Sequence, residues 1–230
     1  MRICGLQKLS MVDYPGKLAA TVFTGGCNLR CPFCHNALLV TRLSESPTLS
    51  EEDVLSFLSG RRGLLDGVVL SGGEPLLHPD APAFLEKVRN LGFTIKVDTN
   101  GCYPDALETI LSRSLADYVA MDIKNCPEKY AETVGIPDFP LENIQRSLSL
   151  LRSSGIPYEL RTTLVRQFHT AADLEAIGQW LGDVPAYYLQ NFEDSGNLIQ
   201  SGLSGFSAEE LQQLADSARK HMKSVTIRGL

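Results

Sequence analysis

The sequence predicts an α/β fold in which parallel strands alternate with helices. Short apolar runs of strand length alternate along the chain with segments whose apolar residues recur at helical spacing. The connections between them are short, as expected for parallel strands joined by crossover helices. Six such repeats fit an open barrel or a doubly wound sheet, and the 230 residues are few for a full eightfold barrel, which takes roughly 250.

The predicted strands are short apolar runs bounded by turn residues. In chain order they cover residues 18–24, 67–71, 93–98, 118–122, 157–165 and 186–190, with one more short run at 225–227.

The predicted helices begin at capping residues or end at glycines. Ser50 precedes the first helix with Asp53 three residues later, which is close to a capping box. Gly92 follows the second helix and Gly155 follows the fourth. The helices cover residues 50–59, 79–91, 105–112, 141–153, 172–181 and 208–222.

The composition is that of an ordinary globular protein, with 43% hydrophobic and 21% charged residues. A net charge of -6 argues against a nucleic-acid groove, which needs clustered Lys and Arg. No apolar run reaches the ~18–20 residues of a membrane helix, and residues 1–10 lack the pattern of a signal peptide. We therefore expect a cytoplasmic protein without a membrane or nucleic-acid partner. We expect one domain over residues 1–230, with a cysteine loop at 24–36 and a C-terminal extension from about 192 to 230.

In both architectures, ligands bind at the carboxyl ends of the strands. Nearly all the chemically active side chains of this sequence follow or end a predicted strand, so they are expected at one edge of the sheet. They are Cys27, Cys31, Cys34, Gly72, Gly73, Glu74, Asp98, Thr99, Asp122, Lys124, Gln190 and Asn191, with Arg161 inside a strand.

Cys27, Cys31 and Cys34 have the spacing C-x3-C-x2-C. Thiolates suit zinc or iron–sulfur clusters, but a structural zinc site or a self-contained cluster normally uses four protein ligands. Three cysteines would leave one iron of a cluster open for another ligand. The alternatives are a zinc site completed by the adjacent His35, or unrelated buried thiols. Three further cysteines are scattered and are expected to be buried small residues, namely Cys4, Cys102 and Cys126.

The cysteine triplet with Phe33 before its last cysteine, followed by Gly-Gly-Glu-Pro at residues 72–75, resembles the radical S-adenosylmethionine superfamily. The segments GLQKLSMVDYPGK, FTGGCNLRCPFCHN, LSGGEPLL, VDTNG and MDIK resemble its glycyl-radical-enzyme activating members, most of all the activators of anaerobic ribonucleoside-triphosphate reductase. One departure is Tyr14, which interrupts a Val-Asp-Gly-Pro-Gly type segment.

This resemblance implies a partial (β/α)6 barrel and an oxidoreductase. The three cysteines would hold a [4Fe–4S] cluster whose fourth iron takes S-adenosylmethionine, and the resulting 5′-deoxyadenosyl radical would act on a glycine of a partner enzyme. The expected cofactor-binding residues are Phe33, Gly72, Gly73, Glu74, Asp122 and Lys124. Glu74 would accept hydrogen bonds from the methionine ammonium, although Gly and Pro also mark ordinary turns.

The resemblance also implies a monovalent-cation site at Asp98, Thr99 and Asp122. Two carboxylates near each other need such a cation or basic partners. His35 is expected either beside the adenine or at the surface, and Arg161 either near the cofactor or in a structural salt bridge.

The expected partners are a glycyl-radical enzyme, in particular anaerobic ribonucleotide reductase, and a flavodoxin- or ferredoxin-type electron donor. Two alternatives stay open. One is a radical enzyme acting on another glycyl-radical protein, a peptide or a small metabolite; the other is a non-catalytic zinc- or cluster-binding adaptor.

Overall fold

The computed structural model describes residues 1–228, and each predicted strand and helix is present in it. The strands are β1 Ile3–Ser10, β2 Ala19–Thr24, β3 Gly67–Gly72, β4 Thr94–Thr99, β5 Tyr118–Asp122, β6 Tyr158–Leu164, β7 Tyr187–Asn191 and β8 Val225–Arg228. The α-helices are α1 Ala37–Thr41, α2 Glu51–Ser59, α3 Ala81–Asn90, α4 Pro104–Ser112, α5 Tyr130–Val134, α6 Leu141–Ser153, α7 Ala171–Leu181 and α8 Ala208–Arg219. Single 3-10 turns are η1 Leu43–Glu45, η2 Pro75–Leu77 and η3 Pro127–Lys129.

Strand β1 and the short helices α1 and α5 were not predicted from the sequence. Strand β1 carries exposed polar residues in its middle, Gln7 and Lys8, so its apolar pattern is weak. It forms because it pairs antiparallel with β2, and that partner follows a long turn in the chain. Helices α1 and α5 have five residues each, too few to show a helical period in the sequence.

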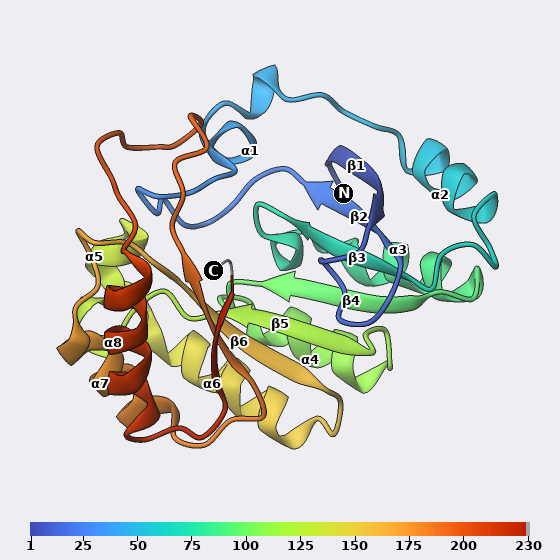
Figure 1. Ribbon diagram of the computed structural model, residues 1–230. Coiled ribbons are helices and arrows are strands. Elements are labelled where there is room, and N and C mark those ends of the chain that lie inside the picture. The colour runs from blue at the N-terminus through green and yellow to red at the C-terminus, as the bar shows by residue number, and fades with distance from the viewer. Residues whose placement is uncertain (229–230) are drawn as a thin grey trace. The chain divides into compact units, whose positions relative to one another are not determined.

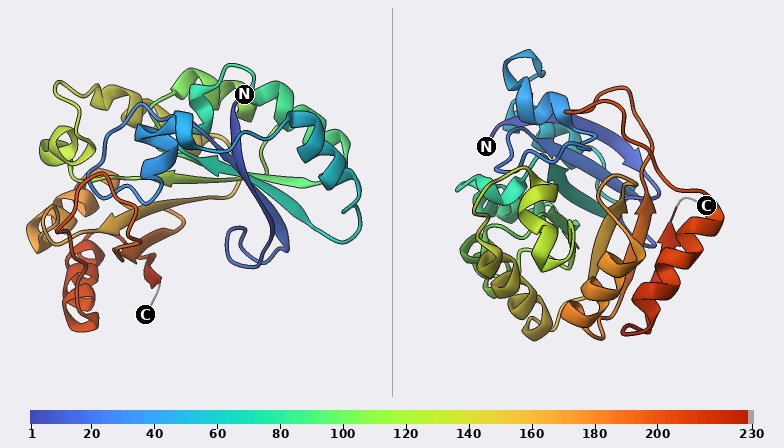
Figure 2. Two further views of the ribbon diagram at one scale, coloured as in Figure 1. Left: turned by 90° about the horizontal axis from the view of Figure 1, so that it is seen from above. Right: turned by 90° about the vertical axis from the view of Figure 1, so that its left-hand side faces the viewer.

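The chain forms two compact units, and the first contains residues 1–28, 38–120 and 142–157. Here β1 pairs antiparallel with β2, and β2, β3 and β4 are parallel neighbours in chain order. Helices α2, α3 and α4 pack side by side next to these strands (Figures 1 and 2). Strands β2 and β3 are mostly buried, with five and four of their six positions buried, which is typical of parallel strands covered on both faces.

Of the described residues, the second unit contains 29–37, 121–141 and 158–228. Strands β6, β7 and β8 are parallel neighbours in chain order. Helices α7 and α8 lie side by side, and α8 packs against β8 (Figures 1 and 2). Residues of β5 belong to both units, 118–120 to the first and 121–122 to the second. The single-domain expectation stays a prediction.

The observed fold is the predicted α/β class, because parallel strands are joined by helices in each unit. The predicted N-cap of α2 is also confirmed, since the Ser50 side chain accepts a hydrogen bond from Asp53 N. Within residues 1–228, the structure contains no helix that is both long and apolar enough to cross a membrane.

Helix α7 begins at a capping box whose buried member, Asp173, offers a stability test. Asp173 caps the helix with Thr170 and pairs with Lys129 at 2.8 Å, and its side chain is 8% exposed. Burial would raise the pKa of Asp173, but hydrogen bonds from Lys129 and Thr170 outweigh burial and lower it. The carboxylate therefore stabilises the fold above its ordinary pKa of about 3.9, and this contribution is lost as the pH falls through the folded-state pKa.

We expect Asp173→Asn to lower the free energy of unfolding by about 1–2 kcal/mol at pH 7. The difference from the unmutated protein should shrink towards pH 3, as measured by urea unfolding at both pH values. Glu210→Gln at the matching position of α8 is the control, because Glu210 is more exposed and its loss should cost less. A deficit for Asp173→Asn that is the same at pH 3 and pH 7 would contradict the prediction.

Candidate active site

In the first unit, the glycines of residues 72–75 bring this segment against the cysteine loop. Gly73 N donates to Thr24 O at 2.9 Å, and Glu74 N donates to Gly26 O at 2.8 Å. A Cβ at Gly72, whose φ is +122°, would lie 2.3 Å from Thr24 N, and one at Gly73 would lie 2.0 Å from Gly26 O. Only glycine allows this approach. The two glycines therefore let the end of β3 and the residue after it pack closely against residues 24–26.

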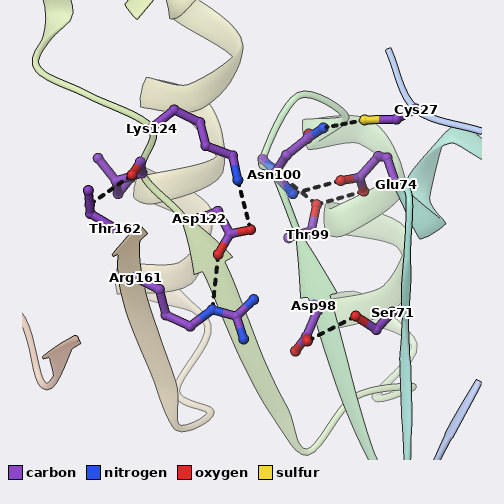
Figure 3. A network of polar contacts seen from close by, with 12 residues as sticks. Cys27, Ser71, Glu74, Asp98, Thr99, Asn100, Asp122, Lys124, Arg161 and Thr162 are labelled. Carbon is purple, nitrogen blue, oxygen red and sulfur yellow. Dashed lines mark hydrogen bonds and ion pairs between the residues drawn. The ribbon is translucent and has the colours of Figure 1, made fainter. Parts of the chain in front are cut away.

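Glu74 is fully buried and accepts three hydrogen bonds. Oε1 accepts from Leu76 N at 3.0 Å and from the Thr99 hydroxyl at 2.8 Å, and Oε2 accepts from Asn100 N at 2.6 Å (Figure 3). The carboxylate therefore joins the loop after β3 to the loop after β4. The contact between Glu74 and the methionine ammonium stays a prediction. The carboxylate that would make it already accepts hydrogen bonds from three donors of the chain.

Asn100 connects this carboxylate to Cys27. Its side-chain amide nitrogen lies 3.7 Å from Cys27 Sγ and 2.9 Å from Asn28 Oδ1 (Figure 3). Its amide oxygen accepts from Cys102 N at 2.9 Å. The structure thereby brings three predicted site residues into one hydrogen-bonded group, Cys27, Glu74 and Thr99, with Asn100 as the link.

Asp98 precedes the last residue of β4 and has polar partners of its own. It accepts from the Ser71 hydroxyl at 3.1 Å (Figure 3). Its other oxygen lies 3.4 Å from Lys96 Nζ. Lys96 is 2% exposed, so a buried cation already balances this carboxylate. Among residues 1–228, no three His, Cys, Asp or Glu side chains are gathered as a site for a metal ion. The monovalent-cation site at Asp98, Thr99 and Asp122 stays a prediction.

In the second unit, Cys31 and Cys34 lie in a turn closed by a hydrogen bond from Cys34 N to Cys31 O at 3.0 Å. Both are free thiols. Burial raises the pKa of Cys31 to about 11 against the opposing effect of Lys124, and burial also raises the pKa of Cys34. Without a metal these thiols are therefore neutral near pH 7, and binding a metal would release their protons.

The aromatic residues of the cysteine loop have different surroundings. Phe33 is 4% exposed, and its ring packs 5.7 Å from that of Phe168 and near His169. His35 is exposed and stacks on Phe192 at 5.3 Å. His35 thus lies at the surface, and its place beside the adenine stays a prediction. The Phe33 ring belongs to the core of this unit, which leaves its backbone for the predicted adenine contact.

Asp122, Lys124 and Arg161 form an ion-pair group where the end of β5 lies beside the middle of β6. Asp122 Oδ2 lies 3.0 Å from Lys124 Nζ, and Oδ1 lies 3.0 Å from Arg161 Nε (Figure 3). Burial would raise the pKa of Asp122, but the two cations outweigh it and lower that pKa to about 2. For Lys124, burial alone would lower the pKa, but the negative charges of Asp122 and of the Cys31 thiolate outweigh burial, and the pKa of Lys124 is raised. Two cations and one carboxylate give this group a net positive charge.

The sequence predicted that the two carboxylates, Asp98 and Asp122, need a cation or basic neighbours. Each has a basic neighbour in the structure, Lys96 beside Asp98 and Lys124 with Arg161 beside Asp122. For Arg161, the structural salt bridge is observed. The side-chain amide of Asn191 hydrogen-bonds to the backbone of Phe206. It donates to Phe206 O and accepts from Phe206 N, both at 2.9 Å.

Two residues of these groups were not assigned a role from the sequence. His169 is buried, accepts from Val165 N at 3.1 Å and donates to Lys124 O at 2.9 Å, so it fixes the backbone at Lys124. Burial lowers the pKa of His169, which keeps the ring neutral. Asn100 had a usable signal, because it follows Asp98 and Thr99 at the end of a predicted strand. His169 had none, since it lies in a loop.

Comparison with known proteins identifies the family. Residues 21–181 match the model of the radical SAM superfamily. A putative glycyl-radical enzyme activating enzyme of Methanocaldococcus jannaschii is 33% identical over 235 aligned residues, covering 99% of this chain and 96% of that protein. The pyruvate formate-lyase-activating enzyme of Clostridium pasteurianum is 33% identical over 129 residues, covering 54% of this chain and 52% of the relative.

The solved structures agree on the fold. A domain of the pyruvate-formate lyase-activating enzyme from Bacteroides vulgatus matches with a TM-score of 0.56 and 21% identity, covering 71% of this chain and 99% of that domain. The chain belongs to the radical S-adenosylmethionine superfamily, whose enzymes use a [4Fe–4S] cluster and S-adenosylmethionine, and it resembles the members that activate glycyl-radical enzymes.

Proposed function

We propose that this enzyme generates a glycyl radical on a partner enzyme, and that the partner is anaerobic ribonucleoside-triphosphate reductase. One observation carries the proposal: a cysteine triplet and its strand-end motifs occur in a chain that matches an activating enzyme over 99% of its length. The motif segments that resemble reductase activators favour this partner over others.

In this proposal Cys27, Cys31 and Cys34 hold the cluster. The donor set suits such a group by its chemistry, because three thiols outside any disulfide lie within eight residues and no protein fourth ligand is needed when the cofactor supplies it. When bound, the cluster and cofactor would supply one-electron cleavage of a carbon–sulfur bond and, from it, abstraction of a hydrogen atom from glycine.

The surrounding residues of the chain orient and shield the reactants. Lys124, with Arg161 beside it, offers positive charge to the carboxylate of the cofactor, and Asp122 holds both cations in place. His169 fixes the backbone at Lys124. Glu74 and the glycine pair hold the loop after β3 against the cysteine loop, and backbone at Phe33 would contact the adenine.

Six free cysteines, three of them proposed cluster ligands, suit a reducing compartment, and we propose the cytoplasm. A low-potential flavodoxin- or ferredoxin-type protein is the proposed electron donor.

The test is electron paramagnetic resonance of the reductase after incubation with this protein, S-adenosylmethionine and a reductant. We expect a glycyl-radical doublet that depends on all three. The C. pasteurianum relative favours a second candidate, a pyruvate formate-lyase type partner. A doublet on that partner but not on the reductase would overturn our choice. Formation of 5′-deoxyadenosine with a doublet on neither would indicate a peptide or metabolite substrate.

We expect Lys124→Met to weaken S-adenosylmethionine binding by about 10- to 100-fold, because it removes a charged hydrogen bond worth ~1.5–3 kcal/mol. Equilibrium dialysis of the anaerobically reconstituted protein measures this loss. Lys129→Met is the matched control, because Lys129 pairs with Asp173 instead of with Asp122. Equal affinities of the two variants would exclude Lys124 from the proposed binding site.

A further inference from the structure

We propose that Asn100 sets the reduction potential of the iron–sulfur cluster through an N–H···S hydrogen bond to Cys27. This inference rests on the proposed function, because it takes Cys27 as a cluster ligand. Asn100 would act on the cluster through Cys27, so it is a positioning residue.

The hydrogen bonds of Asn100 fix which end of its amide faces Cys27. The amide oxygen accepts from Cys102 N at 2.9 Å, so the nitrogen must point the other way. That nitrogen carries two hydrogens, and two acceptors lie near it, Asn28 Oδ1 at 2.9 Å and Cys27 Sγ at 3.7 Å (Figure 3). A flipped amide would place an oxygen against Asn28 Oδ1 and a nitrogen against a backbone N–H.

The loop that carries Asn100 is held rigidly. Asn100 is 5% exposed, and its backbone N–H donates to the buried Glu74 carboxylate at 2.6 Å. The neighbouring Thr99 hydroxyl donates to the same carboxylate at 2.8 Å and accepts from Gly101 N at 3.1 Å. Glu74 therefore holds both Thr99 and Asn100 in place. The side-chain amide of Asn100 reaches Cys27 from this fixed backbone.

Iron binding by Cys27 would strengthen its hydrogen bond from Asn100. Cys27 must lose its proton to bind iron, and the thiolate is then an acceptor only. Hydrogen bonds to cluster sulfurs are among the factors that set the reduction potential. An N–H donor stabilises the more negative, reduced cluster, so it raises the potential. The half-buried position of Cys27 limits the competition of water for the same sulfur.

The test compares Asn100→Asp and Asn100→Ala with the unmutated protein by anaerobic redox titration without S-adenosylmethionine. We expect both variants to retain full iron and to have a lower midpoint potential. The expected effect is about tenfold less reduced cluster at a fixed applied potential, which is ~59 mV for a one-electron couple. Asn100→Asp keeps the shape but adds a charge, so Asn100→Ala separates the lost donor from that charge.

The matched control is Asn125→Ala. Asn125 is also a buried amide, whose oxygen accepts from Cys126 N at 2.7 Å and whose nitrogen donates to Thr133 Oγ1 and Phe168 O. No cysteine sulfur is among these partners, so its midpoint potential should be unchanged. An unchanged potential in Asn100→Ala, or a change confined to Asn100→Asp, would overturn the inference.

A second measurement needs no stable variant. Pulsed electron paramagnetic resonance of the reduced wild-type cluster, with asparagine labelled by 15N in its side chain, should show a weak nitrogen coupling. Its absence would overturn the inference even if Asn100→Ala failed to fold. The proposed function fails separately, because Cys27→Ala would then keep its full iron content and its cofactor cleavage.

Discussion

Replacing Cys31 with alanine should abolish reductive cleavage of S-adenosylmethionine and remove the cluster signal from the spectrum. A four-iron cluster held by three cysteines has no protein ligand to spare, and one position is needed for the cofactor. Cys31 is also buried, in the turn that it forms with Cys34, so we expect no other side chain to take its place as an iron ligand. The measurement is 5′-deoxyadenosine release after anaerobic reconstitution and reduction, together with iron and sulfide content.

Cys126→Ala is the matched control for this prediction. Cys126 is also a buried free thiol with a pKa raised by burial, but it lies outside the loop and its sulfur donates to Asp173. It should keep full iron content and full cleavage. Full cleavage by Cys31→Ala would show that the cysteine triplet does not hold the cluster. Stoichiometric zinc in the unmutated protein, without cofactor cleavage, would favour the adaptor alternative.

Replacing Glu74 with alanine should be the most damaging change outside the cysteines. It leaves three buried donors without their acceptor, Leu76 N, the Thr99 hydroxyl and Asn100 N. Such losses together cost about 3–5 kcal/mol of unfolding free energy. Cofactor affinity should also fall, because the loops after β3 and β4 are no longer joined. Urea unfolding of the apoprotein and equilibrium dialysis of the reconstituted protein measure the two effects.

Glu159→Ala separates instability from a local effect. Glu159 is another fully buried carboxylate, paired with both guanidinium nitrogens of Arg228 at 2.8 Å. Its loss should destabilise the protein by a similar amount and leave cofactor affinity intact. Glu74→Gln should restore part of the stability, since one oxygen acceptor remains. If Glu74→Ala unfolded like the unmutated protein, the three hydrogen bonds would have no net effect on stability.

Some elements of the fold could be predicted from the sequence, and others could not. Strand β3 was predictable from a short apolar run, and β4 from the alternation of Ile95 and Val97 with polar residues, because both patterns are local. Strand β1 was not, because its middle is exposed and it depends on pairing with β2. The capping serine of α2 was predictable from a three-residue spacing, since the cap and its donor belong to the same turn.

The sequence by itself determined the chemical class of the protein. Three cysteines in one short loop predict a metal-binding segment without knowledge of the rest of the chain, because ligation depends on residue type and close spacing. Only the tertiary structure decided how Glu74 and Asn100 are used. Their contacts join residues 26 and 73 positions apart, Glu74 with Asn100 and Asn100 with Cys27. Hydrogen bonds of this kind depend on backbone positions set by strand pairing and packing, which no local pattern encodes.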